Sequence, residues 1–185
     1  MRSIRMNMKV LMVSLIALLL VAMSGCTEPA EPEDPVTNAD LSVDGVALEN
    51  VPEGFEYLGA HSLELEDVKA SYADVSGIVQ ASEGIYQLDS VDYFIIAIEL
   101  DSAEAAEEFV TQYKAGFAPL ANGDRFVEES FNGHDATRVT KYVTANGDQV
   151  PRYHYVWTNE NFVFLVKGNT DDNTIVMDLA EATGF

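Results

Sequence analysis

Hydrophobic residues follow two patterns along this chain: a short continuous run near the N-terminus and periodic spacing further on. Residues 10–22 are apolar at every position except Ser14. From about residue 51 the apolar positions alternate or recur at helical spacing, as they do in a folded domain. Residues 51–185 have the length of one domain, and no internal repeat divides them.

The periodic stretch predicts an antiparallel sheet. Residues 93–100 are apolar at nearly every position, which is typical of a central strand buried on both faces. The pair Asp89-Ser90 is a turn signal that joins this strand to a preceding one at residues 85–88. Shorter alternating runs predict further strands, at residues 55–61, 126–131, 134–143, 150–158 and 161–168.

Two main helices are expected beside this sheet. The first begins at Asp101, an N-cap residue with a glutamate three positions later, and ends at Gly116. The second covers residues 174–183 and has acidic residues at its positive N-terminal end. Residues 64–74 are ambiguous, and a short helix from Asp67 is one interpretation. Together these elements predict an α+β fold, an antiparallel sheet of six or seven strands with two main helices packed on it.

Turn residues predict the register of the last four strands. The Asn-Gly pairs at 132–133 and 146–147 are typical of two-residue hairpin loops, and a third tight turn is expected at 159–160. Two-residue loops at these points place most aromatic residues of these strands on one face, which we expect to be the core beneath the helices. The opposite face then carries Lys141, Arg152 and His154.

Glu129 and Arg138 are polar residues on the predicted aromatic face. In this register Arg138 lies opposite Tyr155 or Val127 and diagonal to Glu129, so an ion pair or a cation–π contact is feasible. Two interpretations are open. The pair either stabilises the sheet margin or belongs to the mouth of a ligand cleft, whose residues would be Glu129, Arg138, Tyr155 and Trp157.

The sequence shows no motif for metal binding or catalysis. His61, His134 and His154 are scattered and lack the spacing of a zinc site, and we expect His154 at the rim of the sheet. Residues 169–173 are rich in oxygens, and a weak calcium site there is the alternative to a helix cap. A nucleophile elbow and a phosphate-binding glycine loop are both absent. We therefore expect no metal, no cofactor and no enzymatic activity.

Acidic residues dominate the charge of the chain. There are 31 Asp and Glu residues against 10 Lys and Arg, for a formal net charge of −21. A surface this negative repels the phosphates of nucleic acids and anionic lipid head groups. Nucleic-acid binding is therefore excluded, and a membrane contact would have to come from a lipid rather than from a basic patch.

The N-terminal segment has the features of an export signal. Residues 1–9 carry three basic side chains and no acidic one, the apolar run follows, and small residues precede Cys26, the single cysteine. This ending resembles the lipobox of prokaryotic lipoproteins, bacterial or archaeal, although Met23 stands where the lipobox usually has leucine. The resemblance implies a signal peptide at 1–25 and a lipid on Cys26. An uncleaved anchor, for which the run is short, and plain secretion are the alternatives.

The segment between Cys26 and the domain is acidic and rich in proline, so residues 26–50 are expected to be a disordered tether. The order of elements in residues 51–185 is loosely similar to that of PsbP/Mog1-like folds. The leading hypothesis is a lipoprotein on the extracytoplasmic face of the cell membrane that binds an unknown protein or small molecule without catalysis. The alternatives are a structural or regulatory envelope component acting by self-association and a carboxylate-dependent envelope hydrolase.

Overall fold

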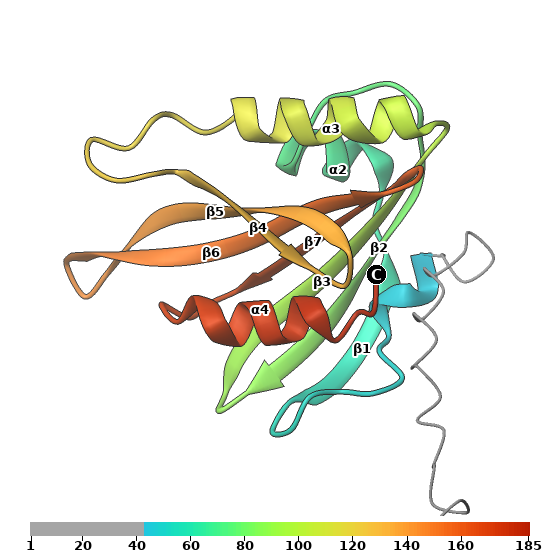
Figure 1. Ribbon diagram of the computed structural model, residues 1–185. Helices are drawn as coiled ribbons and strands as arrows, with labels where there is room; N and C mark the ends of the chain where they lie inside the picture. Colours follow the sequence, from blue (N-terminus) through green and yellow to red (C-terminus); the bar gives the residue numbers. More distant parts are fainter. Residues whose placement is uncertain (1–42) are drawn as a thin grey trace, which may run out of the picture. The chain divides into compact units, whose positions relative to one another are not determined.

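A computed structural model describes residues 43–185, so Cys26 and the predicted signal peptide lie outside the described residues. The described chain is an α+β domain with one antiparallel sheet, as predicted (Figure 1). Its seven strands are β1 Glu56–Ser62, β2 Ile78–Leu88, β3 Val91–Leu100, β4 Phe126–Phe131, β5 His134–Ala145, β6 Asp148–Asn159 and β7 Phe162–Gly168. The helices are the 3-10 helix η1 Val43–Val46 and the α-helices α2 Leu65–Ser71, α3 Ala103–Ala115 and α4 Asn173–Glu181.

The strands lie in the order β1-β2-β3-β7-β6-β5-β4. The chain leaves β3, passes through α3 to the far edge of the sheet at β4, and returns by three hairpins until β7 pairs with β3. Asn132 and Asn146 both have positive φ, at 51° and 53°, which confirms the two Asn-Gly turns. The predicted register between β4, β5 and β6 is therefore correct.

The third turn differs from the prediction by one residue. It occupies Glu160 and Asn161, and Asn159 pairs with Phe162. The reason is a tertiary contact. The main-chain N–H of Leu100 donates to the main-chain carbonyl of Asn161, and the side-chain amide of Asn161 donates to the main-chain carbonyl of Leu100, both at 2.8 Å. Because the register moves by two positions, every side chain keeps its predicted face.

The helix starts also differ slightly from the predictions. Ser102 rather than Asp101 caps α3, with its hydroxyl accepting from the N–H of Ala105 at 3.2 Å. The N–H of Asp101 donates instead to the carbonyl of Gly77 at 2.9 Å, which keeps Asp101 at the end of the strand. The ambiguous segment forms α2, two residues earlier than the start considered at Asp67.

Both faces of the sheet are covered, so the helices do not all lie over the aromatic face, where the sequence predicts them. Helices α2 and α3 lie on one side of the sheet, and α4 lies on the other (Figure 1). We call these the α3 face and the α4 face. On the α3 face Phe109 and Leu165 are fully buried, and on the α4 face Trp157 and Phe164 are. The central strand β3 and its neighbour β7 are apolar on both sides, so each face needs a cover.

Residues 43–50 belong to the folded part, although the sequence predicts that they are part of the tether. Val46 in η1 is buried against the α4 face. The Tyr86 hydroxyl donates to the carbonyl of Val46 at 2.7 Å and accepts from the N–H of Leu48 at 2.8 Å. Gly84 permits this approach, because a Cβ there would collide with the Val46 carbonyl. The predicted boundary at residue 51 is therefore too late. No helix within residues 43–185 is long and apolar enough to cross a membrane.

Candidate functional site

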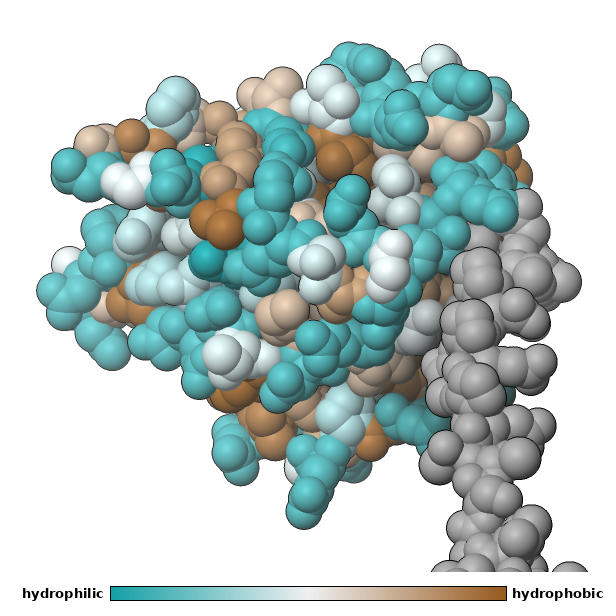
Figure 2. Space-filling view, viewed as in Figure 1, coloured by the Kyte–Doolittle hydropathy of each residue, from teal (hydrophilic) through white to brown (hydrophobic). Residues whose placement is uncertain are grey.

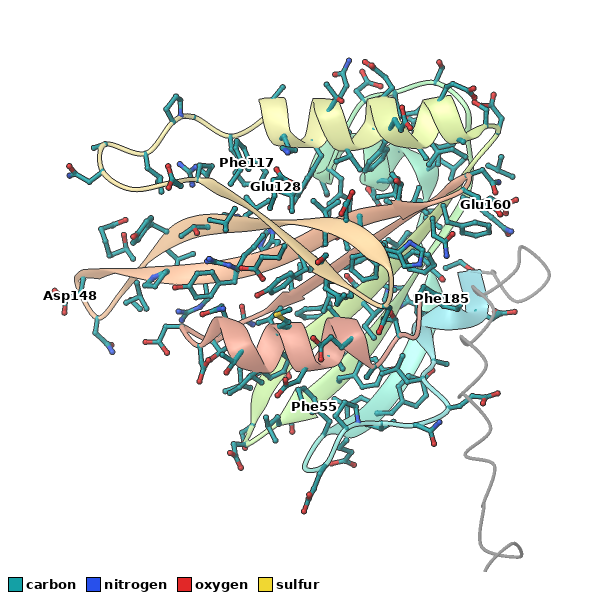
Figure 3. The ribbon with its side chains drawn as sticks, viewed as in Figure 1. Phe55, Phe117, Glu128, Asp148, Glu160 and Phe185 are labelled. Atoms are coloured by element: carbon teal, nitrogen blue, oxygen red, sulfur yellow. The ribbon has the colours of Figure 1, made fainter. Side chains whose placement is uncertain are left out.

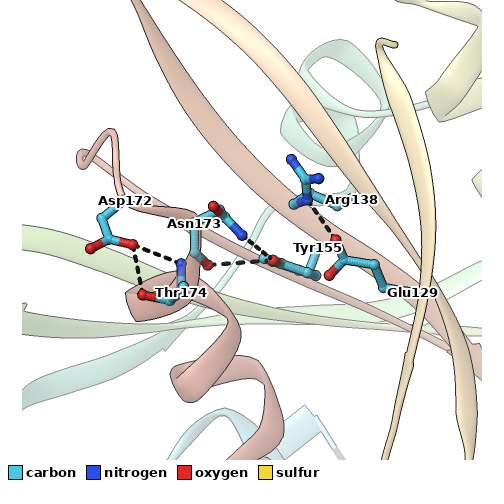
Figure 4. A network of polar contacts seen from close by, with 6 residues as sticks. All are labelled: Glu129, Arg138, Tyr155, Asp172, Asn173 and Thr174. Carbon is cyan, nitrogen blue, oxygen red and sulfur yellow. Dashed lines mark hydrogen bonds and ion pairs between the residues drawn. The ribbon is translucent and has the colours of Figure 1, made fainter.

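Of the four residues predicted as a ligand site, Glu129, Arg138 and Tyr155 lie together on the α4 face (Figure 4). The fourth, Trp157, belongs to the same buried cluster as Tyr155. Arg138 Nε and Glu129 Oε1 are 2.7 Å apart, and the two side chains are 19 % and 21 % exposed. The guanidinium also lies over the ring of Tyr153, 5.4 Å from its centre. The predicted ion pair and a cation–π contact are thus both present, and the Glu129 carboxylate compensates the charge of Arg138 within the fold.

Tyr155 and Trp157 are buried beside this pair. The Tyr155 hydroxyl donates to the carbonyl of Asn173 at 3.3 Å, and burial raises the pKa of Tyr155 to about 12. Trp157 stacks on Phe164, with 5.5 Å between ring centres. The four main cavities within residues 43–185 are lined by other residues than Glu129, Arg138, Tyr155 and Trp157. Their role as ligand residues stays a prediction, and the arrangement by itself serves the packing of α4 on the sheet.

A different site lies on the α3 face, where α3 ends and the β5–β6 hairpin continues past it. A cavity of about 380 Å³ opens there between α2, α3 and the strands. We call it the cationic pocket, and its lining comprises Ser71, Tyr72, Phe94, Tyr113, Phe117, Lys141, Val143, Arg152, His154, Lys167, Gly168 and Asn169. Three of these residues are cationic and none is a carboxylate. In a chain with 31 acidic residues, a cavity without one is a marked departure from the average surface.

Strand register brings the charged side chains of this pocket together. Lys141 on β5 is directly opposite Arg152 on β6, and His154 on β6 is directly opposite Lys167 on β7. All four therefore share one face on three adjacent strands. Like charges placed directly opposite each other repel, so the pair Lys141 and Arg152 destabilises the hairpin unless an anion lies between them.

Aromatic rings form the opposite wall of the pocket. Tyr113 on α3 packs against Phe117 with ring centres 5.1 Å apart, and Tyr72 lies 6.4 Å from Tyr113. Phe117 follows the last turn of α3 and lies beside the strands (Figure 3). Its ring is 6.4 Å from the ring of His154 in an edge-to-face arrangement. The pocket thus combines a cationic floor on the sheet with an aromatic wall on the helices.

His154 and Tyr113 form a neutral hydrogen-bonded pair, with 2.6 Å between the Tyr113 hydroxyl and His154 Nδ1. Burial, and then the charges of Lys167 and Lys141, lower the pKa of His154 to about 3. Burial also raises the pKa of Tyr113 above its ordinary value. At neutral pH the imidazole is therefore uncharged, and it adds a polar ring rather than a further cation to the pocket.

The three cationic side chains of the pocket differ in the hydrogen bonds and ion pairs that they form within the protein. Lys167 donates to the Tyr72 hydroxyl at 2.8 Å and lies 3.5 Å from a carboxylate oxygen of Glu83. Arg152 donates one N–H to the carbonyl of Pro151 at 2.8 Å. Among the described residues, neither Lys141 nor Arg152 takes part in an ion pair. These two side chains retain N–H groups and positive charge for a ligand.

Sequence reasoning placed Lys141, Arg152 and His154 on the correct face but did not recognise them as a site. His154 is partly buried against Tyr113 rather than at the rim. The available signal was the alternation of basic residues on one face of a hairpin in an otherwise acidic chain. The contribution of Lys167 and of the aromatic wall depends on the packing of α2 and α3. Within residues 43–185 no group of three His, Cys, Asp or Glu side chains is arranged to hold a metal ion.

Comparison with known proteins does not assign this chain to a family. The chain matches no family model, and neither a curated protein nor a solved structure is significantly similar to it. The chemistry of the cationic pocket is therefore the basis on which a function can be proposed.

Proposed function

We propose that the protein is a non-enzymatic, lipid-anchored binding protein of the extracytoplasmic membrane face, and that it binds a small organic anion in the cationic pocket. The observation that carries the proposal is the unneutralised pair Lys141 and Arg152 in a cavity without carboxylates. Anions bind where cations and N–H donors converge, and a guanidinium suits a carboxylate or phosphate because its donors match both oxygens.

An anion between these side chains would relieve their mutual repulsion. Its apolar part would contact Tyr113 and Phe117, whose rings face the strands. A concave site with aromatic walls and a few directed polar groups is the usual form of a small-molecule site. The strongly negative remainder of the protein disfavours large polyanions, which favours a ligand small enough to lie within the cavity.

The pocket supports binding better than carboxylate-dependent hydrolysis. Such a reaction needs an Asp or Glu positioned as acid, base or nucleophile, and the lining contains none. Self-association is the remaining alternative. The exposed large apolar side chains of the described residues are few, namely Tyr57, Leu58, Val79 and Tyr142. Figure 2 shows hydrophilic side chains over most of the face in view, with apolar ones in small separate areas, which gives self-association less support.

The membrane location rests on the residues around Cys26. It is tested by the intact mass of protein extracted from membranes, compared with the Cys26→Ser variant. We expect a mature chain that starts at Cys26 and carries lipid, and a Cys26→Ser protein that leaves the membrane fraction. An unlipidated native chain would contradict the anchor and leave the binding proposal untouched.

Anion binding is tested by thermal unfolding of the purified protein with benzoate and with benzyl alcohol, a neutral molecule of similar shape. Benzoate should raise the midpoint because a ligand of the native state stabilises it by mass action. The Lys141→Gln and Arg152→Gln variants should lose this response, and high salt should weaken it. Lys69→Gln on α2 is the matched control, since Lys69 pairs with Glu66 and does not line the pocket. An equal response to both compounds, or a response kept by both pocket variants, would contradict the proposal.

A further inference from the structure

A second cavity shares Lys141 with the cationic pocket, and we infer that the ligand is an elongated molecule with two anionic groups, one in each cavity. This inference rests on the proposed function. The second cavity measures about 690 Å³ and lies between the chain that follows α3 and the β5–β6 hairpin. Lys141 lines both cavities, and the second one also contains Arg125 and no carboxylate.

Arg125 is held in place by the main chain rather than by an acidic residue. Its Nε donates to the carbonyl of Ala118 at 2.9 Å, and one terminal nitrogen donates to the carbonyl of Thr140 at 2.6 Å. The guanidinium lies 5.8 Å from the centre of the Phe117 ring. Among the described residues Arg125 forms no ion pair. A fixed guanidinium with its charge unneutralised is suited to an anionic group, because little side-chain freedom is lost on binding.

The cations follow one another across the sheet. Lys167 is on β7, Arg152 on β6 and Lys141 on β5, and Arg125 directly precedes β4, where its carbonyl accepts from the N–H of Thr140. Neighbouring strands are about 4.8 Å apart, so the backbones of Arg152 and Arg125 are separated by about 10 Å. A single carboxylate or phosphate is too small to contact both ends. Two anionic groups joined by a linker would satisfy both.

Apolar surface lies beside Lys141, the residue that the two cavities share. Phe117 lines the cationic pocket and lies under the guanidinium of Arg125 in the direction of the second cavity. Leu120 and Tyr142 add apolar surface to the second cavity. An aliphatic or aromatic linker would therefore pass over Phe117 and beside Lys141. The chemical class that fits is a dicarboxylate or a comparable dianion with a hydrophobic middle.

The test measures binding of straight-chain dicarboxylates from malonate to sebacate to the full-length protein by calorimetry at low ionic strength. Monocarboxylates of the same chain length are the reference. We expect affinity to rise with length to an optimum at which the dicarboxylate binds roughly tenfold or more tightly than its monocarboxylate, as for one additional charged contact. Arg125→Gln should reduce that dicarboxylate to the affinity of the monocarboxylate and leave monocarboxylate binding unchanged.

Arg125 also bonds to Ala118 in the chain after α3, so Arg125→Gln could affect folding as well as binding. A second variant is therefore needed. Asn122→Asp is nearly isosteric, lies at an exposed position in the lining of the second cavity, and adds a negative charge there. It should weaken dicarboxylate binding selectively, whereas Lys69→Gln should change neither series. Dicarboxylates that bind no better than monocarboxylates at any length would overturn this inference and leave the proposed function intact. Absence of binding in both series would overturn both.

Discussion

The two faces of the sheet hold their cations in opposite ways. On the α4 face Arg138 pairs with Glu129 at 2.7 Å and lies over Tyr153. Its positive charge is therefore compensated by a carboxylate of the same fold. On the α3 face Lys141 and Arg152 stand opposite each other without a carboxylate. An acidic chain has ample carboxylates to neutralise its few cations. Cations that have no carboxylate partner in such a chain are therefore the more informative ones about function.

The elements that pack on each face explain why these cations are paired on one face and unpaired on the other. The α4 face is closed by α4, by η1 and by Phe185, which stacks on Phe164 with 4.9 Å between ring centres. On the α3 face the helix ends at Ala115, while β5 and β6 extend beyond it toward their turn (Figure 1). Past the end of α3 no helix of the described chain covers this face, and the cavities lined by Lys141 lie there, beside the chain that follows the helix.

The largest expected effects test whether both faces are core. Phe109→Ala on the α3 face and Trp157→Ala on the α4 face should each lower the free energy of unfolding by about 3–5 kcal/mol, because both side chains are fully buried. Urea denaturation of the two variants and the parent measures this. A loss below about 1 kcal/mol for Phe109→Ala would show that the α3 face is not a packed core.

The pH dependence of stability should distinguish the α3 face. The pKa of His154 in the folded protein, about 3, is below its usual value of 6.5. Between these values the unfolded chain binds more protons than the native one, so stability falls as pH drops below 6.5. His154 contributes at most about 1.4 kcal/mol per pH unit to this slope.

The measurement is urea denaturation between pH 7 and pH 4.5 for the parent and for His154→Gln. The variant should lose less stability over this interval than the parent, whatever its stability at pH 7. His61→Gln, at an exposed position on β1, is the control and should follow the parent. Parallel curves for the parent and His154→Gln would mean that the imidazole is not held neutral by the pocket.

The ion pair of the α4 face predicts an intermediate effect. Glu129→Gln leaves the partly buried Arg138 without its counter-charge and should lower the free energy of unfolding by about 1–2 kcal/mol. A double-mutant cycle with Arg138→Gln isolates the coupling between the two side chains. A coupling near zero would place this pair with ordinary surface ion pairs and remove the contrast between the faces.

The smallest effect has the opposite sign. Lys141→Gln should leave stability unchanged or raise it by a few tenths of a kcal/mol at low salt, because it removes a like-charge contact with Arg152. The gain should vanish in high salt as the repulsion is screened. Thermal unfolding at two ionic strengths provides the measurement. A clear loss of stability would show that Lys141 is used structurally, as Arg138 is, rather than kept for a ligand.

Local signals in the sequence predicted much of the fold. The Asn-Gly pairs determined two hairpins and, with them, which residues share a face, because side chains alternate along a strand. The proximity of Glu129 and Arg138 followed from this register alone. The turn at Glu160 and Asn161 was displaced because Asn161 bonds to Leu100, 61 positions away in the sequence, and no local pattern reports such a contact.

The sequence by itself determined the sheet, the two main helices, the negative charge and the placement of Lys141 and Arg152 on the same face of a hairpin. Only the tertiary structure decided which helix covers which face, that η1 closes the α4 face, and where the cover of the α3 face ends. These depend on packing between segments far apart in the chain, which periodicity does not encode. The cationic pocket belongs to the second group, since its cations come from strands and its aromatic wall from helices that meet only in the folded protein.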